Sequence, residues 1–233
     1  MSRFRAITPD EVRETLVEFG ALWQYSGQPD AKKEHALLTS GNHSDGFVIV
    51  GEVLKQHSEV LSEFGDGLLA LLGEYWDQRI ITHVVGADTS STALAEYVAW
   101  QIGARHICMV KTTTSEGNEQ VWGPGNEPLG ERAVILQVEE LITTSSSALM
   151  VREGIRRANP NSPFSYVPYL PVIVDRSDPD RRVTVIGESQ VQFLLHLEIR
   201  NYPPDSCPYC KVGSRAIKPK EAGNWRRLMD QHR

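Results

Sequence analysis

Three features are scarce in this 233-residue sequence: cysteine, an excess of positive charge, and long apolar runs. Three cysteines cannot form the disulfide framework of a small secreted protein. A net charge of -6 disfavours nonspecific binding to the phosphate backbone of nucleic acids. No segment approaches the ~20 apolar residues that cross a bilayer, and the polar residues 1–10 lack the apolar core of a signal peptide. We therefore expect a cytoplasmic protein that binds neither nucleic acid nor membrane.

The apolar content, 40% of the residues, is enough for the core of one α/β domain. The sequence predicts a first helix after Thr8, with Pro9 in its first turn and Glu11 placed to complete a capping box. Apolar segments at residues 36–38 and 47–50 are predicted strands, and the polar residues between them predict that the two strands form a hairpin.

Helical patterns and apolar strand patterns alternate from residue 58 onward. Helices are predicted at 58–76, 92–102 and 147–158, and strands at 80–85, 106–111, 133–138, 166–174, 183–186 and 191–199. Such alternation is typical of an α/β fold with a mainly parallel sheet and helices on both faces. Residues 112–130 have four glycines, two prolines and no apolar period, which predicts a long exposed loop.

The composition changes after residue 202, where two prolines precede the sequence Cys207-Pro208-Tyr209-Cys210 and a basic tail. This segment is too short to bury a core of its own. We therefore divide the chain into a main domain, residues 1–202, and a C-terminal extension, residues 203–233.

The pair Cys207 and Cys210 supplies half of a tetrahedral zinc site. The other ligands would have to come from His196, Cys108 or a second subunit. A redox role is less favoured, because the pair lies in a proline-flanked tail and not at the start of a helix. Zinc at Cys207 and Cys210 and a metal-free pair are the two interpretations that remain.

The most informative segment is a predicted loop at 139–147, which follows the predicted strand at 133–138. Glu139 and Glu140 come first, then two apolar residues, then a run of hydroxyl residues at a predicted helix start: Thr143, Thr144, Ser145, Ser146 and Ser147. Hydroxyls and the free amides of a helix N-terminus can hold a phosphate, and carboxylates can accept hydrogen bonds from vicinal sugar hydroxyls. The pattern fits a ribose 5-phosphate site. The alternative is a capped helix beside two surface glutamates.

Residues 139–147 resemble the phosphoribosyl pyrophosphate signature of the type I phosphoribosyltransferases. Further segments resemble orotate phosphoribosyltransferases and occur in the same order: the turn at 38–44, the segment 84–87, and Val174-Asp175-Arg176. The tail at 207–213 is similar to an extension of some family members. The resemblance covers the chain from about residue 12 to residue 219. It implies the type I phosphoribosyltransferase fold with an N-terminal hood of helix and hairpin and a short cysteine-containing appendage.

The resemblance implies a role for each matching residue. Glu139 and Glu140 would contact the ribose hydroxyls, and the hydroxyl run would surround the 5-phosphate. The implied site for phosphoribosyl pyrophosphate comprises Gly86, Ala87, Asp88, Glu139, Glu140, Thr143, Thr144, Ser145, Ser146 and Ser147. Lys111 matches the basic residue at the start of the mobile loop that closes on pyrophosphate and is the implied catalytic residue.

The base-binding residues implied by the resemblance are Phe47 and Arg176. Phe47 would stack near the base, and Arg176 would pair with a carboxylate such as that of orotate, since its planar fork matches a carboxylate bidentately. An ordinary surface salt bridge is the alternative role for Arg176. No side chain is assigned as a catalytic metal ligand. The family context implies Mg²⁺ as cofactor during transfer.

The sequence departs from the family pattern in the predicted loop. Beyond Lys111, residues 112–130 contain no Lys, Arg or His and include three acidic residues, Glu116, Glu119 and Glu127. Fixed positive donors and a metal stabilise the charge that develops on a departing pyrophosphate. An acidic loop works against that stabilisation.

Other departures concern the ligand loops. Ser145 and Ser146 stand where the family has glycines, which let a backbone approach a ligand closely. Asp88 stands among residues that replace expected glycines, where it could hold Mg²⁺ or repel pyrophosphate. Thr39 stands where the orotate enzymes usually have lysine.

Two functional hypotheses follow. The first is an enzyme of pyrimidine biosynthesis that transfers a phosphoribosyl group to orotate or a related base, with activity impaired by the substitutions. The second is a non-catalytic regulatory protein that binds a nucleotide or ribose phosphate in the same pocket. The partner is a small molecule in both cases, and the family resemblance implies a homodimer.

Overall fold

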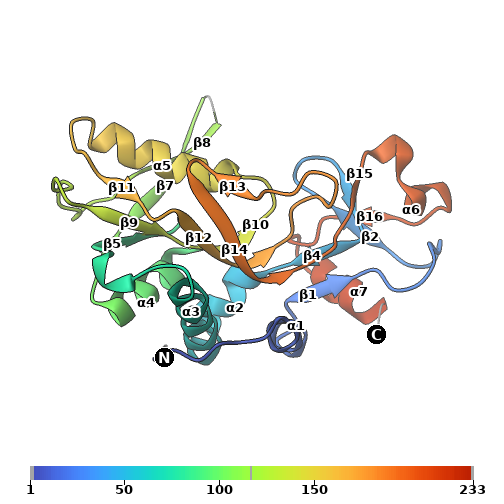
Figure 1. Ribbon diagram of the computed structural model, residues 1–233. Helices are drawn as coiled ribbons and strands as arrows, with labels where there is room; N and C mark the ends of the chain where they lie inside the picture. The colour runs from blue at the N-terminus through green and yellow to red at the C-terminus, as the bar shows by residue number, and fades with distance from the viewer. Residues whose placement is uncertain (1–2, 116, 232–233) are drawn as a thin grey trace.

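The computed structural model describes residues 3–115 and 117–231, and two four-stranded sheets lie at its centre (Figure 1). The strands of the first sheet, in the order β11-β9-β5-β6, are β11 (Ser165–Tyr166), β9 (Val134–Gln137), β5 (His83–Val85) and β6 (Arg105–Ile107). The strands of the second, in the order β10-β12-β14-β13, are β10 (Glu139–Ile142), β12 (Tyr169–Asp175), β14 (Ser189–His196) and β13 (Val185–Ile186). Every pairing in the two sheets is parallel except β13 with β14.

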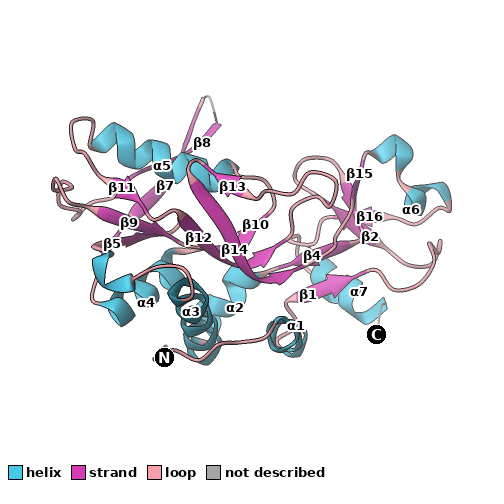
Figure 2. Cartoon of the chain, viewed as in Figure 1, coloured by secondary structure: helices cyan, strands magenta, loops and turns pink. Residues whose placement is uncertain are grey.

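Helices cover both faces of these sheets, as the sequence predicts. Figure 2 shows α2 (Val50–Gln56), α3 (Ser58–Gly73) and α4 (Thr92–Ile102) below the sheets and α5 (Ser146–Ala158) above them. Alternate strand residues supply the two cores: Val84 and Leu136 pack with α3 and α4, whereas Val85 and Ile135 pack with Ile155 and its neighbours on α5. None of the helices among the described residues is both long and apolar enough to span a membrane.

The segment after β9 corrects the prediction of a loop at the two glutamates. The chain passes through Val138, whose amide still bonds to the carbonyl of Val85, and continues directly as β10. β10 then pairs with β12, with Glu139 opposite Val172. Glu139 and Glu140 are therefore held in a strand, which fixes their directions more firmly than a loop would.

Residues 109–122 correct the prediction of a long exposed loop. β7 (Met109–Thr114) and β8 (Gly117–Trp122) form an antiparallel hairpin with Met109 opposite Trp122. Composition misled the prediction because glycine and proline surround a threonine-rich segment of strong strand propensity. β8 packs on α5 at Gly154, where an added Cβ would overlap the carbonyl oxygen of Gln120.

The N-terminal region is partly as predicted. α1 (Pro9–Glu18) begins with the predicted capping box, in which Thr8 and Glu11 bond to each other's backbone amides. The predicted hairpin between residues 36–38 and 47–50 is wrong. The pairs are instead β2 (His35–Leu37) with β3 (His43–Ser44), and β1 (Leu22–Gln24) with β4 (Gly46–Val48). β3 consists of only two residues, both polar, so no apolar pattern marks it. The predicted strand at 47–50 also extends too far, because Val50 is the first residue of α2.

The chain's C-terminal residues complete a third four-stranded sheet, which we call the hood sheet. Its order is β15-β3-β2-β16, where β15 is Asn201–Tyr202 and β16 is Ala216–Ile217. Three helices accompany it: η2 (Pro204–Ser206), α6 (Pro208–Lys211) and α7 (Asn224–Gln231). Figure 1 shows the hood sheet, α6 and α7 together at one end of the molecule. Segments far apart in the sequence thus share one sheet.

Candidate functional site

Four of the residues singled out from the sequence line one cavity of about 240 Å³: Phe47, Glu140, Thr143 and Arg176. The cavity lies where β4, the β5–α4 loop, β10 and the end of β12 meet. It therefore sits beyond the carboxyl ends of parallel strands, where open α/β sheets bind ligands. Two lysines, Lys55 of α2 and Lys220 of the C-terminal extension, complete its positive lining.

Arg176 is a buried cation at the end of β12. Only 6% of the residue is exposed, and within the described residues its Nε has no hydrogen-bond partner. Desolvation lowers the pKa of Arg176 to about 10, and the charge of Asp45 acts in the opposite direction. The guanidinium carbon lies 5.6 Å from the centre of the Phe47 ring. An aromatic face beside an unsatisfied guanidinium is a surface that suits a flat anionic ligand.

Glu139 and Glu140 share one buried hydroxyl. The Oγ of Ser91 lies 2.9 Å from a carboxylate oxygen of each glutamate, and it also accepts from the amide of Glu140 at 3.1 Å. The other oxygen of Glu139 accepts from the side-chain amide of Gln137 at 3.0 Å. Arg152 of α5 fixes that amide by donating to its oxygen at 2.8 Å. A continuous hydrogen-bonded chain therefore runs from α5 to the cavity wall.

Burial keeps one proton on the two carboxyl groups of this hydrogen-bonded network. Desolvation first, and the charge of Glu140 second, raise the pKa of Glu139 to about 8. Burial also raises the pKa of Glu140. Ser91 has one proton and can donate to only one carboxylate, so a protonated Glu139 donates to Ser91 while Ser91 donates to Glu140. Glu140, which lines the cavity, is thereby left as the hydrogen-bond acceptor that a ligand meets.

The loop after β5 brings Asp88 beside the β7–β8 hairpin. The carboxylate of Asp88 accepts from the backbone amide of Lys111 at 3.0 Å, while the Lys111 side chain is exposed. Gln120 of β8 bonds to the backbone of Asp88 twice, at 3.1 Å and 2.7 Å. Gly86 allows this tight turn, because an added Cβ would lie 2.5 Å from the carbonyl oxygen of Ser91. Ala87 is buried beside it.

The hydroxyl run extends from the end of β10 into the first turn of α5. Thr143 lines the cavity, and the hydroxyls of Thr144 and Ser146 are 3.2 Å apart. Ser145 stands at the N-cap of α5, and its side chain makes no capping hydrogen bond to the described residues. Ser147 is exposed in the first turn. Thr143 is therefore the one member of the run in the cavity lining, and Thr144, Ser145, Ser146 and Ser147 follow it outside that lining.

Sequence reasoning missed four contributors: Lys55, Ser91, Gln120 and Lys220. Ser91 lies at the end of the loop after β5, and nothing in the sequence shows that its hydroxyl joins the two glutamates. Gln120 lay in a segment predicted to be an exposed loop, although it is buried. Lys220 lies 44 residues beyond Arg176 in sequence and reaches the cavity only because the extension folds back on the hood sheet.

The cysteine pair lies apart from this cavity, and its neighbours differ from those expected. His196 bonds to Asp175 at 3.1 Å, and Cys108 bonds through its backbone to Asn126. Neither joins the group of candidate metal ligands that forms around the pair, which comprises His35, His43, Cys207 and Cys210.

Comparison with known proteins gives a consistent result, although no model of a protein family matches the sequence. The orotate phosphoribosyltransferase of Caldanaerobacter subterraneus subsp. tengcongensis is 33% identical over 190 residues, covering 80% of this chain and 88% of that protein. That of Pelotomaculum thermopropionicum is 31% identical over 213 residues, covering 91% and 97%. The crystal structure of the Aeropyrum pernix orotate phosphoribosyltransferase aligns with a TM-score of 0.56 at 18% identity, covering 80% of this chain and 93% of that one.

The sheet order, the helices on both faces and the structural alignment define a type I phosphoribosyltransferase fold. The alignment at 18% identity establishes the fold alone, whereas the sequence relatives cover most of both chains. By its identity to them of more than 30%, the chain belongs to the orotate phosphoribosyltransferase family.

Proposed function

We propose that the cavity binds phosphoribosyl pyrophosphate and orotate, and that the protein transfers the phosphoribosyl group to this carboxylated base. The observation that carries the proposal is Arg176, a buried guanidinium whose Nε has no partner among the described residues. It shares one cavity with Glu140 and Thr143. A carboxylate acceptor, a hydroxyl and a cation able to pair with a carboxylate thus line one cavity of about 240 Å³.

The proposed roles follow from these positions. Glu140 accepts hydrogen bonds from the ribose hydroxyls, and Glu139 holds it in place through Ser91. Residues 143–147 and the N-terminus of α5 bind the 5-phosphate. Arg176 forms two parallel hydrogen bonds with the base carboxylate, and Phe47 lies against the ring. Gly86, Ala87 and Asp88 face the pyrophosphate, with Lys111 above them as the catalytic cation.

The donor set around the cavity fits Mg²⁺. Glu140 and Thr143 in the cavity wall would offer a carboxylate and a hydroxyl oxygen, and Asp88, in the β5–α4 loop that also contributes to the wall, would offer a second carboxylate. These are the hard ligands this ion takes together with substrate phosphates. When bound, Mg²⁺ supplies positive charge that stabilises the departing pyrophosphate.

The family membership supports a homodimer. Residues 1–202 then form the phosphoribosyltransferase-like domain and residues 203–233 its extension.

A second candidate function, ligand binding without turnover, is favoured by the β7–β8 hairpin. Lys111 is its one basic residue, and no other follows before residue 130. Two acidic side chains in this region are offset by ion pairs, Glu119 with Arg157 and Glu127 with Arg105. The hairpin is therefore less repulsive to pyrophosphate than its composition implies, but it lacks the cations that promote departure.

Calorimetric titration with phosphoribosyl pyrophosphate and Mg²⁺, followed by orotate turnover on the same sample, tests the proposal. We expect saturable binding at one site per chain and formation of orotidine 5′-monophosphate. Binding without turnover would establish the second function. No binding of either phosphoribosyl pyrophosphate or a nucleoside monophosphate would contradict both.

Lysines added to the β7–β8 hairpin distinguish a protein that catalyses the transfer slowly from one that has lost catalysis. In Thr113→Lys/Ser115→Lys, two cations stand on the exposed end of the hairpin, and the substitutions remove the hydrogen bond from the Thr113 hydroxyl to Asn118. Because one preorganised donor contributes about 10²–10³ in kcat and these are mobile, we expect turnover to rise roughly tenfold in steady-state assays. The control Thr113→Glu/Ser115→Glu should not raise it. Unchanged turnover with intact binding would favour the binding function.

A further inference from the structure

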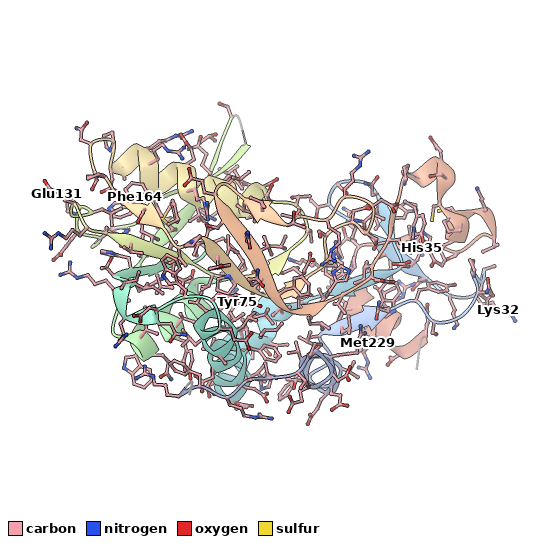
Figure 3. The ribbon with its side chains drawn as sticks, in the orientation of Figure 1. Lys32, His35, Tyr75, Glu131, Phe164 and Met229 are labelled. Carbon is pink, nitrogen blue, oxygen red and sulfur yellow. The ribbon has the colours of Figure 1, made fainter. Side chains whose placement is uncertain are left out.

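Four side chains with metal-binding atoms converge beneath the hood sheet, away from the ligand cavity. His35 lies on β2 and His43 on β3, while Cys207 precedes α6 and Cys210 lies within it. Figure 3 labels His35, between the hood strands and the C-terminal extension. The four ligand atoms all lie within 4.8 Å of one another, and three of the four residues are buried.

Four of the six distances among these atoms are close to those of a tetrahedron around zinc. With Zn–N near 2.0–2.1 Å and Zn–S near 2.3 Å, two nitrogens are about 3.3 Å apart, and a nitrogen and a sulfur about 3.6 Å. In the structure the Nε2 of His35 lies 3.1 Å from the Nδ1 of His43. The sulfurs of Cys207 and Cys210 lie 3.5 Å and 3.6 Å from His35, and that of Cys210 lies 3.2 Å from His43.

The surroundings of His35 fix which of its nitrogens can bind a metal. Ser214 donates its one hydroxyl proton to the carbonyl oxygen of Lys33, 2.6 Å away. Ser214 must therefore accept from the Nδ1 of His35, 2.8 Å away. This bond places the proton on Nδ1 and leaves the lone pair of Nε2 directed at the other three side chains. Metal-binding histidines are commonly held by such a bond to the second nitrogen.

We propose that His35, His43, Cys207 and Cys210 bind one Zn²⁺ in a closed structural site. Two thiolates and two imidazoles in a tetrahedron are the ligand set that zinc prefers. All four positions are filled by side chains, so no position is open for a substrate. This inference goes beyond the proposed function and does not depend on it.

The site would join parts of the chain that are far apart in sequence. Cys210 lies 167 residues after His43, so the metal closes a long loop and restricts the unfolded chain. Binding of this kind stabilises the folded state directly. The extension held by the site also carries Lys220, which lines the ligand cavity, and Trp225, which bonds to the carbonyl of Gly20 at 2.9 Å.

Metal analysis of the full-length protein tests the site. The protein is purified without a histidine tag from zinc-supplemented cells, and its metal content is measured by inductively coupled plasma mass spectrometry. We expect about one zinc per chain, falling to about a tenth or less in Cys207→Ser and Cys210→Ser. The control Cys108→Ser removes the remaining cysteine and should keep its zinc.

A paired substitution separates loss of a ligand from loss of the fold. His43→Cys offers another zinc ligand and should retain the metal, whereas His43→Ala should lose it. Cobalt exchange of the wild-type protein should give a sulfur-to-cobalt charge-transfer band, which needs no variant. A zinc-free wild-type protein from zinc-replete cells, or full zinc in Cys207→Ser/Cys210→Ser, would overturn the proposal.

Discussion

Arg176→Met is expected to weaken the binding of orotidine 5′-monophosphate about 100- to 1,000-fold. Removing one partner of a buried, hydrogen-bonded charge pair costs roughly 2–5 kcal/mol, and Arg176 is the buried cation of the cavity. Uridine 5′-monophosphate lacks the carboxylate, so its weaker binding should change little. Calorimetric titration with both nucleotides measures the preference for the carboxylate directly.

The control for this prediction is Arg181→Met. Arg181 lies in the same segment after β12 but is exposed, so its replacement should leave both affinities unchanged. The Arg176→Met protein should also resist urea at least as well as the wild type, since it no longer buries an unsatisfied charge. An unaltered ratio of the two nucleotide affinities in Arg176→Met would remove Arg176 from the base site.

We expect the free energy of unfolding of the wild-type protein to fall strongly as the pH rises. Glu139→Gln should abolish this fall. Glu139 has a pKa of about 8 in the folded protein, against 4.5 as its ordinary value. Between these values the folded state binds more protons than the unfolded state, so the free energy of unfolding falls with increasing pH. At about 1.4 kcal/mol per pKa unit, the interval from 4.5 to about 8 corresponds to a loss on the order of 5 kcal/mol.

Glutamine reproduces the protonated form of Glu139. Its NH₂ group donates to Ser91, and its oxygen accepts from Gln137, as the neutral acid does. Urea denaturation at several values between about pH 5 and about pH 8 measures the difference between variant and wild type. Glu131→Gln, at an exposed position, is the matched control. Parallel pH profiles for Glu139→Gln and the wild type would show that Glu139 is ionised in the folded protein.

Local signals in the sequence predicted much of the fold. The capping box at Thr8 and Glu11 fixed the start of α1, and the apolar spacing found α3, α4 and α5 within a few residues of their ends. Of the site residues named in the segment 139–147, Glu140 and Thr143 lie in the wall of the cavity. Each of these features is contained in a short stretch of sequence, where periodicity or capping chemistry is sufficient.

The remaining features depend on contacts between distant segments. The pairing of β2 with β3 and of β1 with β4 involves strands of two or three residues, too short for a recognisable period. The β7–β8 hairpin is defined by its packing on Gly154, which no local pattern records. His35 and His43 were not linked to the cysteines because more than 160 residues separate them along the chain.

Because the extension folds back onto the hood sheet, the walls of the ligand cavity are synthesised at different times during translation. Translation adds Phe47, Glu140 and Arg176 to the chain long before Lys220, although all four residues line one cavity. A nascent chain can assemble both central sheets while its cavity still lacks a wall, because β16 has yet to join β2. Synthesis of residues 203–220 therefore completes the binding site, and a chain truncated after residue 202 would lack the wall that Lys220 supplies.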